Sequence, residues 1–212
     1  KSLFDKGLVM GMASAMPTRG TSRYSRAQLA YEFSRLKITG YPNSFQTTRA
    51  NLPEALKLMA HVLKEPAFPE SEFEQMRQQV LVSFEASRNE PQSVANYALA
   101  RHFNRYPRGD VRYAGTLDEA IEDVKKVTLD EVKAFHRDFY GANPAEMAIV
   151  GDFDPREITP LVNELFGSWR AKQPFAPVLE TYADVKPTTQ VLNTPDKENG
   201  FYTARINLDL NV

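Results

Sequence analysis

The stretch AEMAIVGDFDPREITPLVNELFGSW, residues Ala145 to Trp169, decides the fold because it orders an apolar run, a turn, a helix start and a helix stop. The run 147–150 has the composition of a strand buried on both faces, and Gly151-Asp152 closes it with residues that tolerate turn conformations. The first part of the stretch therefore predicts a buried strand followed by a tight turn.

A helix is predicted next. Asp154 is placed to cap it, Pro155 to occupy its first position and Glu157 to complete a capping box. Gly167 suits a left-handed cap at the other end. Pro160 removes a backbone donor about one turn in, so the sequence predicts an irregular first turn or a second start there. The apolar face at helical spacing is Leu161, Val162, Leu165 and Phe166.

Working outward, helices fill the middle of the chain. A helix rich in small residues is predicted from Ser2 until Pro17 ends it, and 37–51 has the pattern of a strand pair around a Tyr-Pro-Asn turn. Three further helices begin with a capping box, in which a hydroxyl residue is followed three positions later by Glu or Gln. These pairs are Ser25 with Gln28, Thr116 with Glu119, and Thr128 with Glu131.

The composition changes after Trp169. Residues 171–187 hold several prolines and little periodicity, which is typical of an extended linker. Residues 189–193 and 201–210 alternate as two strands around a polar turn. The sequence therefore predicts a peptidase-like domain over 1–170, a linker over 171–187, and strands over 188–212 that lead into a truncated second domain.

The 212 residues suffice for one substantial domain, or one domain and part of another. A formal net charge of -1 gives no electrostatic case for nucleic acid or an anionic membrane, and no apolar stretch reaches membrane-spanning length. The absence of cysteine excludes disulfides, thiolate metal sites and thiol nucleophiles. The chain starts at Lys1 with no initiator Met, which suggests a fragment of a longer protein.

Several motifs, in order, carry a resemblance to a known family. They are Arg19-Gly20-Thr21 with Ser25, Phe68-Pro69 before a long helix, Gly115-Thr116, the segment 128–140, Asn143-Pro144, Gly151-Asp152-Phe153-Asp154-Pro155 and Phe166-Gly167-Ser168-Trp169. Together they resemble the pitrilysin and insulinase superfamily of zinc metallopeptidases, which includes the mitochondrial processing peptidases. The resemblance covers most of residues 8–206. It implies an α+β fold of the processing-peptidase metallohydrolase type, in which a mixed or antiparallel sheet carries a helical layer.

The family's catalytic motif is H-x-x-E-H, in which two His bind zinc, the Glu activates water, and a Glu of the following long helix completes the ligand set. Alignment on the Gly-Thr loop places Gly11 and Ala15 at the two His and Ser14 at the Glu. Ser83 falls at the fourth ligand position. None of these side chains can take over its role, so the chain is predicted to have no catalytic residue, no metal ligand and no cofactor of its own.

The other polar residues have simpler interpretations. His61 and Glu65 are spaced to ligate a metal, but without a second nearby His a half-exposed helix position is favoured. His102 and His136 are expected at helix interfaces. Arginines around Tyr106 and Tyr113 could contact a partner or a peptide carboxylate, although a solvated helix end is the favoured interpretation. That cluster contains Arg101, Arg105, Arg108 and Arg112.

The resemblance implies the zinc-free, catalytically silent half of a zinc metalloprotease, which forms the wall of a substrate chamber opposite the catalytic half and binds extended peptide. Its expected partners are a zinc-bearing domain or subunit of the same family and the peptide substrate. The alternative is a structural subunit like the core proteins of respiratory complexes, and a third possibility is an independent metalloenzyme. Exported bacterial relatives favour a periplasmic location, which the sequence itself does not identify.

Overall fold

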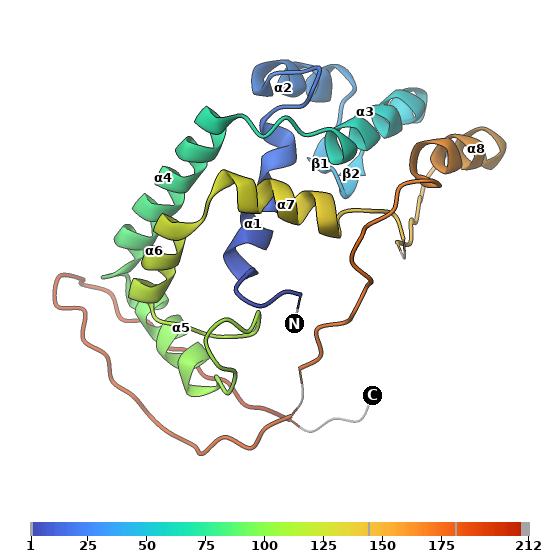
Figure 1. Cartoon of the computed structure of the whole chain (residues 1–212). Helices are drawn as coiled ribbons and strands as arrows, with labels where there is room; N and C mark the ends of the chain where they lie inside the picture. The colour runs from blue at the N-terminus through green and yellow to red at the C-terminus, as the bar shows by residue number, and fades with distance from the viewer. Residues whose placement is uncertain (1, 144, 181, 209–212) are drawn as a thin grey trace. The chain divides into compact units, whose positions relative to one another are not determined.

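The computed structural model describes residues 2–143, 145–180 and 182–208 (Figure 1). Pro144 of the family-like segment and residues 209–210 of the last predicted strand lie outside them. The elements, in chain order, are α1 (Gly7–Ala15), η1 (Met16–Arg19), α2 (Arg26–Arg35), β1 (Thr39–Tyr41), β2 (Ser44–Gln46), η2 (Arg49–Asn51), α3 (Leu52–Lys64), α4 (Glu70–Ser87), α5 (Pro91–His102), α6 (Leu117–Lys126), α7 (Leu129–Phe139) and α8 (Pro155–Phe166).

The chain divides into two compact units, which are described separately. Unit 1 comprises Lys1–Leu8, Gln75–Val127 and Ala176–Val212. Unit 2 comprises Val9–Glu74 and Thr128–Phe175. The domain boundaries predicted from the sequence, at 170 and 187, stay predictions.

The core of unit 2 lies between α2, α3 and the β1–β2 hairpin, which gather together in Figure 1. The hairpin is antiparallel, with Gly40 opposite Phe45, so the predicted strand pair is confirmed. Gly40 has a φ of 110°, and a Cβ there would lie 2.4 Å from the Ser44 carbonyl oxygen, so the turn requires glycine. The buried cluster contains Leu29, Leu36, Ile38, Ala55, Leu58, Met59 and Val62.

Two further helices complete unit 2 through contacts with α3. The His136 ring of α7 donates from Nε2 to the Leu63 carbonyl oxygen at 2.8 Å. Lys64 Nζ donates to the Leu165 carbonyl oxygen of α8 at 3.0 Å, and α8 lies beside α3 in Figure 1. Together with the small antiparallel sheet, these helices confirm the predicted α+β class.

Unit 1 is built on α5, α6 and the larger part of α4. Its buried side chains come mainly from α6 and the residue after it: Ile121, Val124 and Val127. The Arg88 guanidinium after α4 is paired with Asp118 of α6 at 2.6 Å. The helix α5 has no fully buried residue, although alanine and leucine occupy much of it.

Three of the four predicted capping boxes are confirmed. The Ser25, Thr116 and Thr128 hydroxyls accept from the third helical N–H, and Gln28, Glu119 and Glu131 bond back to the cap N–H. Each box satisfies two backbone donors that a helix start would otherwise leave free. These helix starts could be predicted because both partners lie within four residues of one another.

The predicted strand at 147–150 is wrong. No strand is assigned there, and Val150 is 97% exposed. A strand must pair its backbone groups with a neighbour, and the described part of the chain brings no second strand beside this one. The predicted turn is present, with Gly151 at a φ of 140°.

The ends of α8 also differ from prediction. Asp154 caps the helix through the Arg156 N–H at 2.9 Å, without the predicted box to Glu157, and α8 continues through Pro160. Gly167 has a right-handed φ of -61°, so the left-handed cap is wrong. Glycine is required there for space, because a Cβ would lie 2.5 Å from the Asn163 carbonyl oxygen.

The two predicted strands near the end of the chain are not found among the described residues. Residues 182–208 have no regular secondary structure, apart from a turn near 195–196. We refer to residues 176–208 as the strap. Figure 1 shows it as a long extended segment in orange and red.

We predict that Thr128→Ala lowers the free energy of unfolding by about 1 kcal/mol, because the helix α7 loses its cap oxygen. Urea unfolding measures this change. Thr189→Ala, at an exposed position of the strap, is the matched control and should change the stability by less than about 0.5 kcal/mol. Equal losses in the two variants would show that the box adds no stability.

Candidate functional site

The three positions predicted to replace the zinc motif lie together on one face of α1. Gly11, Ser14 and Ala15 are exposed, whereas Val9, Met12 and Ala13 on the other side are buried. The Ser14 hydroxyl donates to the Gly11 carbonyl oxygen at 2.7 Å. A Cβ added at Gly11 would meet no atom within 4 Å, so this face is open.

The side chains on this face do not fit a zinc ion. Glycine and alanine carry no ligand atom, and the Ser14 hydrogen is already donated within the helix. Ser83, the fourth predicted position, is exposed on the part of α4 that belongs to unit 1. Within the residues that the structure describes, no three His, Asp or Glu side chains are grouped so as to hold a metal ion. That these positions correspond to the family's ligands stays a prediction.

His61 lies in a polar network rather than beside a second histidine. Its Nε2 is 2.8 Å from Thr21 Oγ1, and its Nδ1 is 3.4 Å from Glu65 Oε2. Glu65 in turn accepts from the Ser22 hydroxyl at 2.8 Å. That hydrogen bond is the main cause of a lowered pKa for Glu65.

The order hydroxyl, imidazole, carboxylate has the outline of a catalytic triad, but Thr21 cannot act as the nucleophile. Its oxygen accepts from the N–H groups of Arg23 and Tyr24, so its hydrogen is donated to His61 Nε2, which places the ring proton on Nδ1. Thr21 is only 6% exposed, so no substrate carbonyl could reach it. The network instead fixes the Gly20-Thr21 loop.

Backbone bonds hold the same loop against the segment after α3. The Ala67 N–H donates to the Gly20 carbonyl oxygen at 3.0 Å, and the Ser22 N–H donates to the Glu65 carbonyl oxygen at 3.0 Å. Arg19 adds an ion pair with Glu72 of α4 at 3.2 Å. The family-like loop therefore serves as a rigid junction between α2, α3 and the start of α4.

His136 is a buried structural histidine, as the sequence predicted for a helix interface. Its ring is 8% exposed and makes an edge contact with Phe68 at a centroid distance of 5.3 Å. Because a carbonyl oxygen can only accept, the bond to Leu63 fixes the proton on Nε2. Burial lowers the pKa of His136 below its ordinary value, so the ring is neutral in the folded protein.

This lowered pKa predicts a loss of stability in acid. As the pH falls below about 6.5, the unfolded chain takes up a proton that the folded His136 does not, so the free energy of unfolding decreases. His136→Gln keeps an N–H donor but cannot titrate. We expect the native chain to lose more stability than this variant between pH 7.5 and pH 5, as measured by urea unfolding. Equal losses would exclude His136 as a source of the acid sensitivity.

Two arginines of the unit 1 cluster are paired by carboxylates. Arg112 forms two bonds with Asp110, at 2.9 and 2.8 Å, and stacks on the Tyr106 ring with 3.9 Å to its centroid. These bonds lower the pKa of Asp110 to about 2. Arg108 pairs with Asp123 at 2.8 Å and with Glu119 at 3.3 Å. The cluster is therefore more ordered than the solvated helix end that the sequence favoured.

Side chains in and after α5 also donate to backbone oxygens of the strap. Arg112 Nη1 donates to the Leu179 carbonyl oxygen at 2.7 Å. Arg105 Nη1 donates to that of Tyr182 at 2.9 Å. No sequence pattern indicated these contacts, because the partners are 67 and 77 residues apart along the chain.

Comparisons with known proteins show which protein family this chain resembles. The family model of the peptidase M16 inactive domain matches residues 126–206, from the end of α6 into the strap. The matched segment is less than half of the chain, and it is similar to the peptidase M16 inactive domain. The resemblance to a silent peptidase-like domain, drawn from the sequence motifs, is thereby confirmed. A search of curated proteins gave no match.

Solved structures show the same fold at low identity. The chain is similar to a peptidase M16 inactive domain from Pseudomonas fluorescens, with 24% identity and a TM-score of 0.67 over 82% of this chain and 44% of that one. For a protease from Helicobacter pylori the identity is 19% and the TM-score is 0.66, over 86% of this chain and 45% of that one. For the periplasmic protease PqqL from Escherichia coli the identity is 14% and the TM-score is 0.63, over 81% of this chain and 21% of that one. The chain thus spans less than half the length of each.

The helices offer no membrane-crossing segment: none of those described combines the length and the apolar character that a bilayer requires.

Proposed function

We propose that this chain is the non-catalytic half of an M16-type zinc metalloprotease, where it forms the wall of a substrate chamber opposite the catalytic half and supports peptide binding. The match of residues 126–206 to the M16 inactive domain supports the proposal most directly. The open face at Gly11, Ser14 and Ala15 agrees with it, because the family-like helix keeps its buried side but carries no metal ligand.

By this proposal the zinc and the water-activating glutamate belong to a partner domain that carries an intact H-x-x-E-H, in the same polypeptide or in another subunit. This chain holds no cofactor. Its own contribution is to shape and enclose an extended peptide, which restricts water and orients the scissile bond toward the partner's metal.

The direct test combines this chain with an M16 domain from the same organism that carries the intact motif. We expect the two to co-purify in equal amounts, and cleavage of an unstructured peptide to require both, because the chamber is incomplete without its second wall. The readout is zinc-dependent peptidase activity, with the catalytic Glu replaced by Gln in the partner as the control. Association without any effect on cleavage would favour the structural, core-protein alternative, and no association would overturn the proposal.

The placement of the lost motif can be tested separately. Gly11→His with Ala15→His puts two imidazoles one turn apart on an open helix face, so the variant should bind zinc. Adding Ser83→Glu should tighten binding by about tenfold or more if that position is the remaining ligand. Isothermal titration with zinc measures both effects. Val82→Glu on the neighbouring face of α4 is the matched control, and an equal gain from it would show that Ser83 is misassigned.

A further inference from the structure

Three polar side chains of unit 1 that lie outside the strap donate to it, and each acceptor is a backbone carbonyl oxygen. Arg112 and Arg105 donate to the carbonyl oxygens of Leu179 and Tyr182, as described above. His102 Nε2 donates to that of Lys186 at 2.9 Å. We call these three donors, His102, Arg105 and Arg112, the row.

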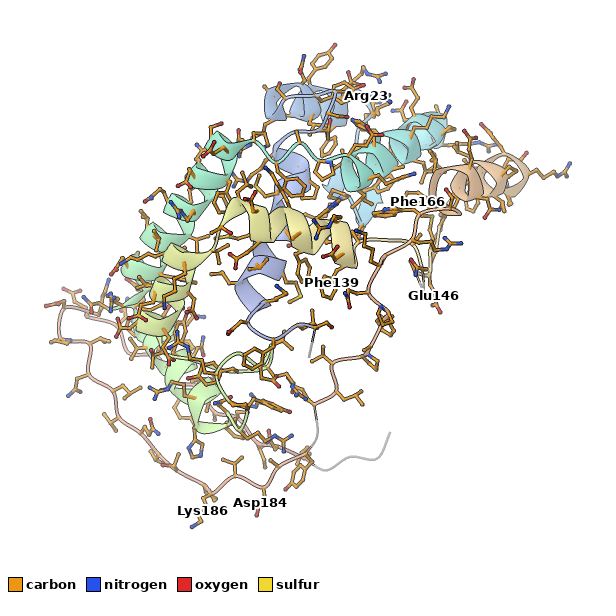
Figure 2. The ribbon with its side chains drawn as sticks, in the orientation of Figure 1. Arg23, Phe139, Glu146, Phe166, Asp184 and Lys186 are labelled. Carbon is orange, nitrogen blue, oxygen red and sulfur yellow. The ribbon has the colours of Figure 1, made fainter. Side chains whose placement is uncertain are left out.

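The described side chains between residues 179 and 186 take little part in this attachment. Farther along the strap, Lys197 pairs with Glu90 and the Arg205 guanidinium lies over the Phe103 ring, at 4.6 Å from its centroid. Leu179 is 65% exposed and Tyr182 is 48% exposed, although their carbonyl oxygens are bonded. Figure 2 shows the Asp184 and Lys186 side chains directed away from α5. A set of contacts made to the main chain and not to the side chains recognises an extended polypeptide without reading its sequence.

The donors are ordered before any peptide arrives. The Arg112 guanidinium donates two hydrogen bonds to Asp110 and stacks on the Tyr106 ring. Arg105 also contacts Tyr106, with 5.4 Å to the ring centroid. Because little side-chain freedom remains to be lost on binding, such a row can hold a peptide at a small entropic cost.

The charge balance favours a neutral acceptor over an anion. Asp110 already offsets the charge of Arg112, while Glu119 and Asp123 pair with Arg108. A peptide carboxylate or a phosphate would compete with these groups, whereas a carbonyl oxygen needs only a spare N–H of the guanidinium fork. The pairing of Arg112 and Arg108 therefore favours a carbonyl oxygen over the peptide carboxylate that the arginine cluster first suggested.

Space for a longer ligand lies beside the row. A cleft of about 820 Å³ runs between α5 and the strap, and the α5 side is lined by Pro91, Ala95, Ala98 and Leu99. The small side chains of α5 leave the cleft open, and its remaining wall is formed by strap residues. When the strap is displaced, an extended peptide bound to the row would contact this apolar surface of α5 in its place.

We propose that the row His102, Arg105 and Arg112 is a binding site for extended polypeptide of low sequence specificity, and that the chain's own residues 179–180 and 182–186 occupy it. Displacement of the strap would free the row for an exogenous peptide. The inference deepens the proposed function and rests on it for the class of ligand, while the seating of the strap is a property of this chain alone.

The absence of native cysteine allows the test to be made with spin labels in the full chain. Asn96→Cys on α5 and Asp184→Cys on the strap are both exposed positions for labelling. Pulsed electron paramagnetic resonance should give one narrow distance distribution. The double variant Arg105→Ala with Arg112→Ala should broaden the distance distribution and lengthen the mean distance. Arg101 is an exposed arginine of α5, so Arg101→Ala should leave the distribution unchanged.

Peptide is then added to the labelled chain. The synthetic peptide PVLETYADVKPT, the sequence of residues 177–188, should release the strap and reproduce the broad distribution. A peptide of the same composition in shuffled order should release the strap at a concentration within about threefold of that needed with the native order, because the contacts are to carbonyl groups.

Three results would overturn the proposal: an unchanged distribution in the double-alanine variant, no displacement by either peptide, or displacement by the native order alone. Circular dichroism confirms that each variant keeps its helices. A failure here would leave intact the association with a zinc-bearing partner, which is measured by co-purification and cleavage, so the two ideas fail separately.

Discussion

The structure depends on how backbone groups outside helices find hydrogen-bond partners. The two three-residue strands of the hairpin are the only strands in the described part of the chain, so a ladder satisfies few of these groups. The Gly20-Thr21 loop is held by backbone bonds to the segment after α3, and the strap is held by arginine and histidine side chains. In unit 1 side chains thus bind backbone carbonyl groups that a sheet would pair elsewhere.

The sequence predicted best those features whose partners are close along the chain. The boxes at Ser25, Thr116 and Thr128 need only a residue three positions on, and the hairpin needs only the turn between β1 and β2. Helical periodicity likewise identified α3, because its apolar residues repeat on one face and are buried together. Local chemistry fixes such elements whatever the rest of the molecule does.

Predictions that depended on distant partners were less successful. The run 147–150 has strand composition, yet composition cannot supply the neighbouring strand that burial requires. The role of Arg105 and Arg112 was likewise hidden, since their carbonyl partners lie far along the chain. The candidate site is the intermediate case. The spacing of Gly11, Ser14 and Ala15 predicts a shared helix face, whereas whether Ser83 belongs to the same site depends on tertiary structure and stays a prediction.

The exposed apolar segments bear on how the protein behaves in solution. Val150, Val191, Tyr202 and Ile206 are between 77% and 97% exposed, in stretches of extended backbone with β-branched or aromatic composition. Such stretches are templates for intermolecular cross-β pairing and aggregation. Colloidal solubility, rather than folding stability, therefore sets the highest concentration at which the isolated chain stays monodisperse.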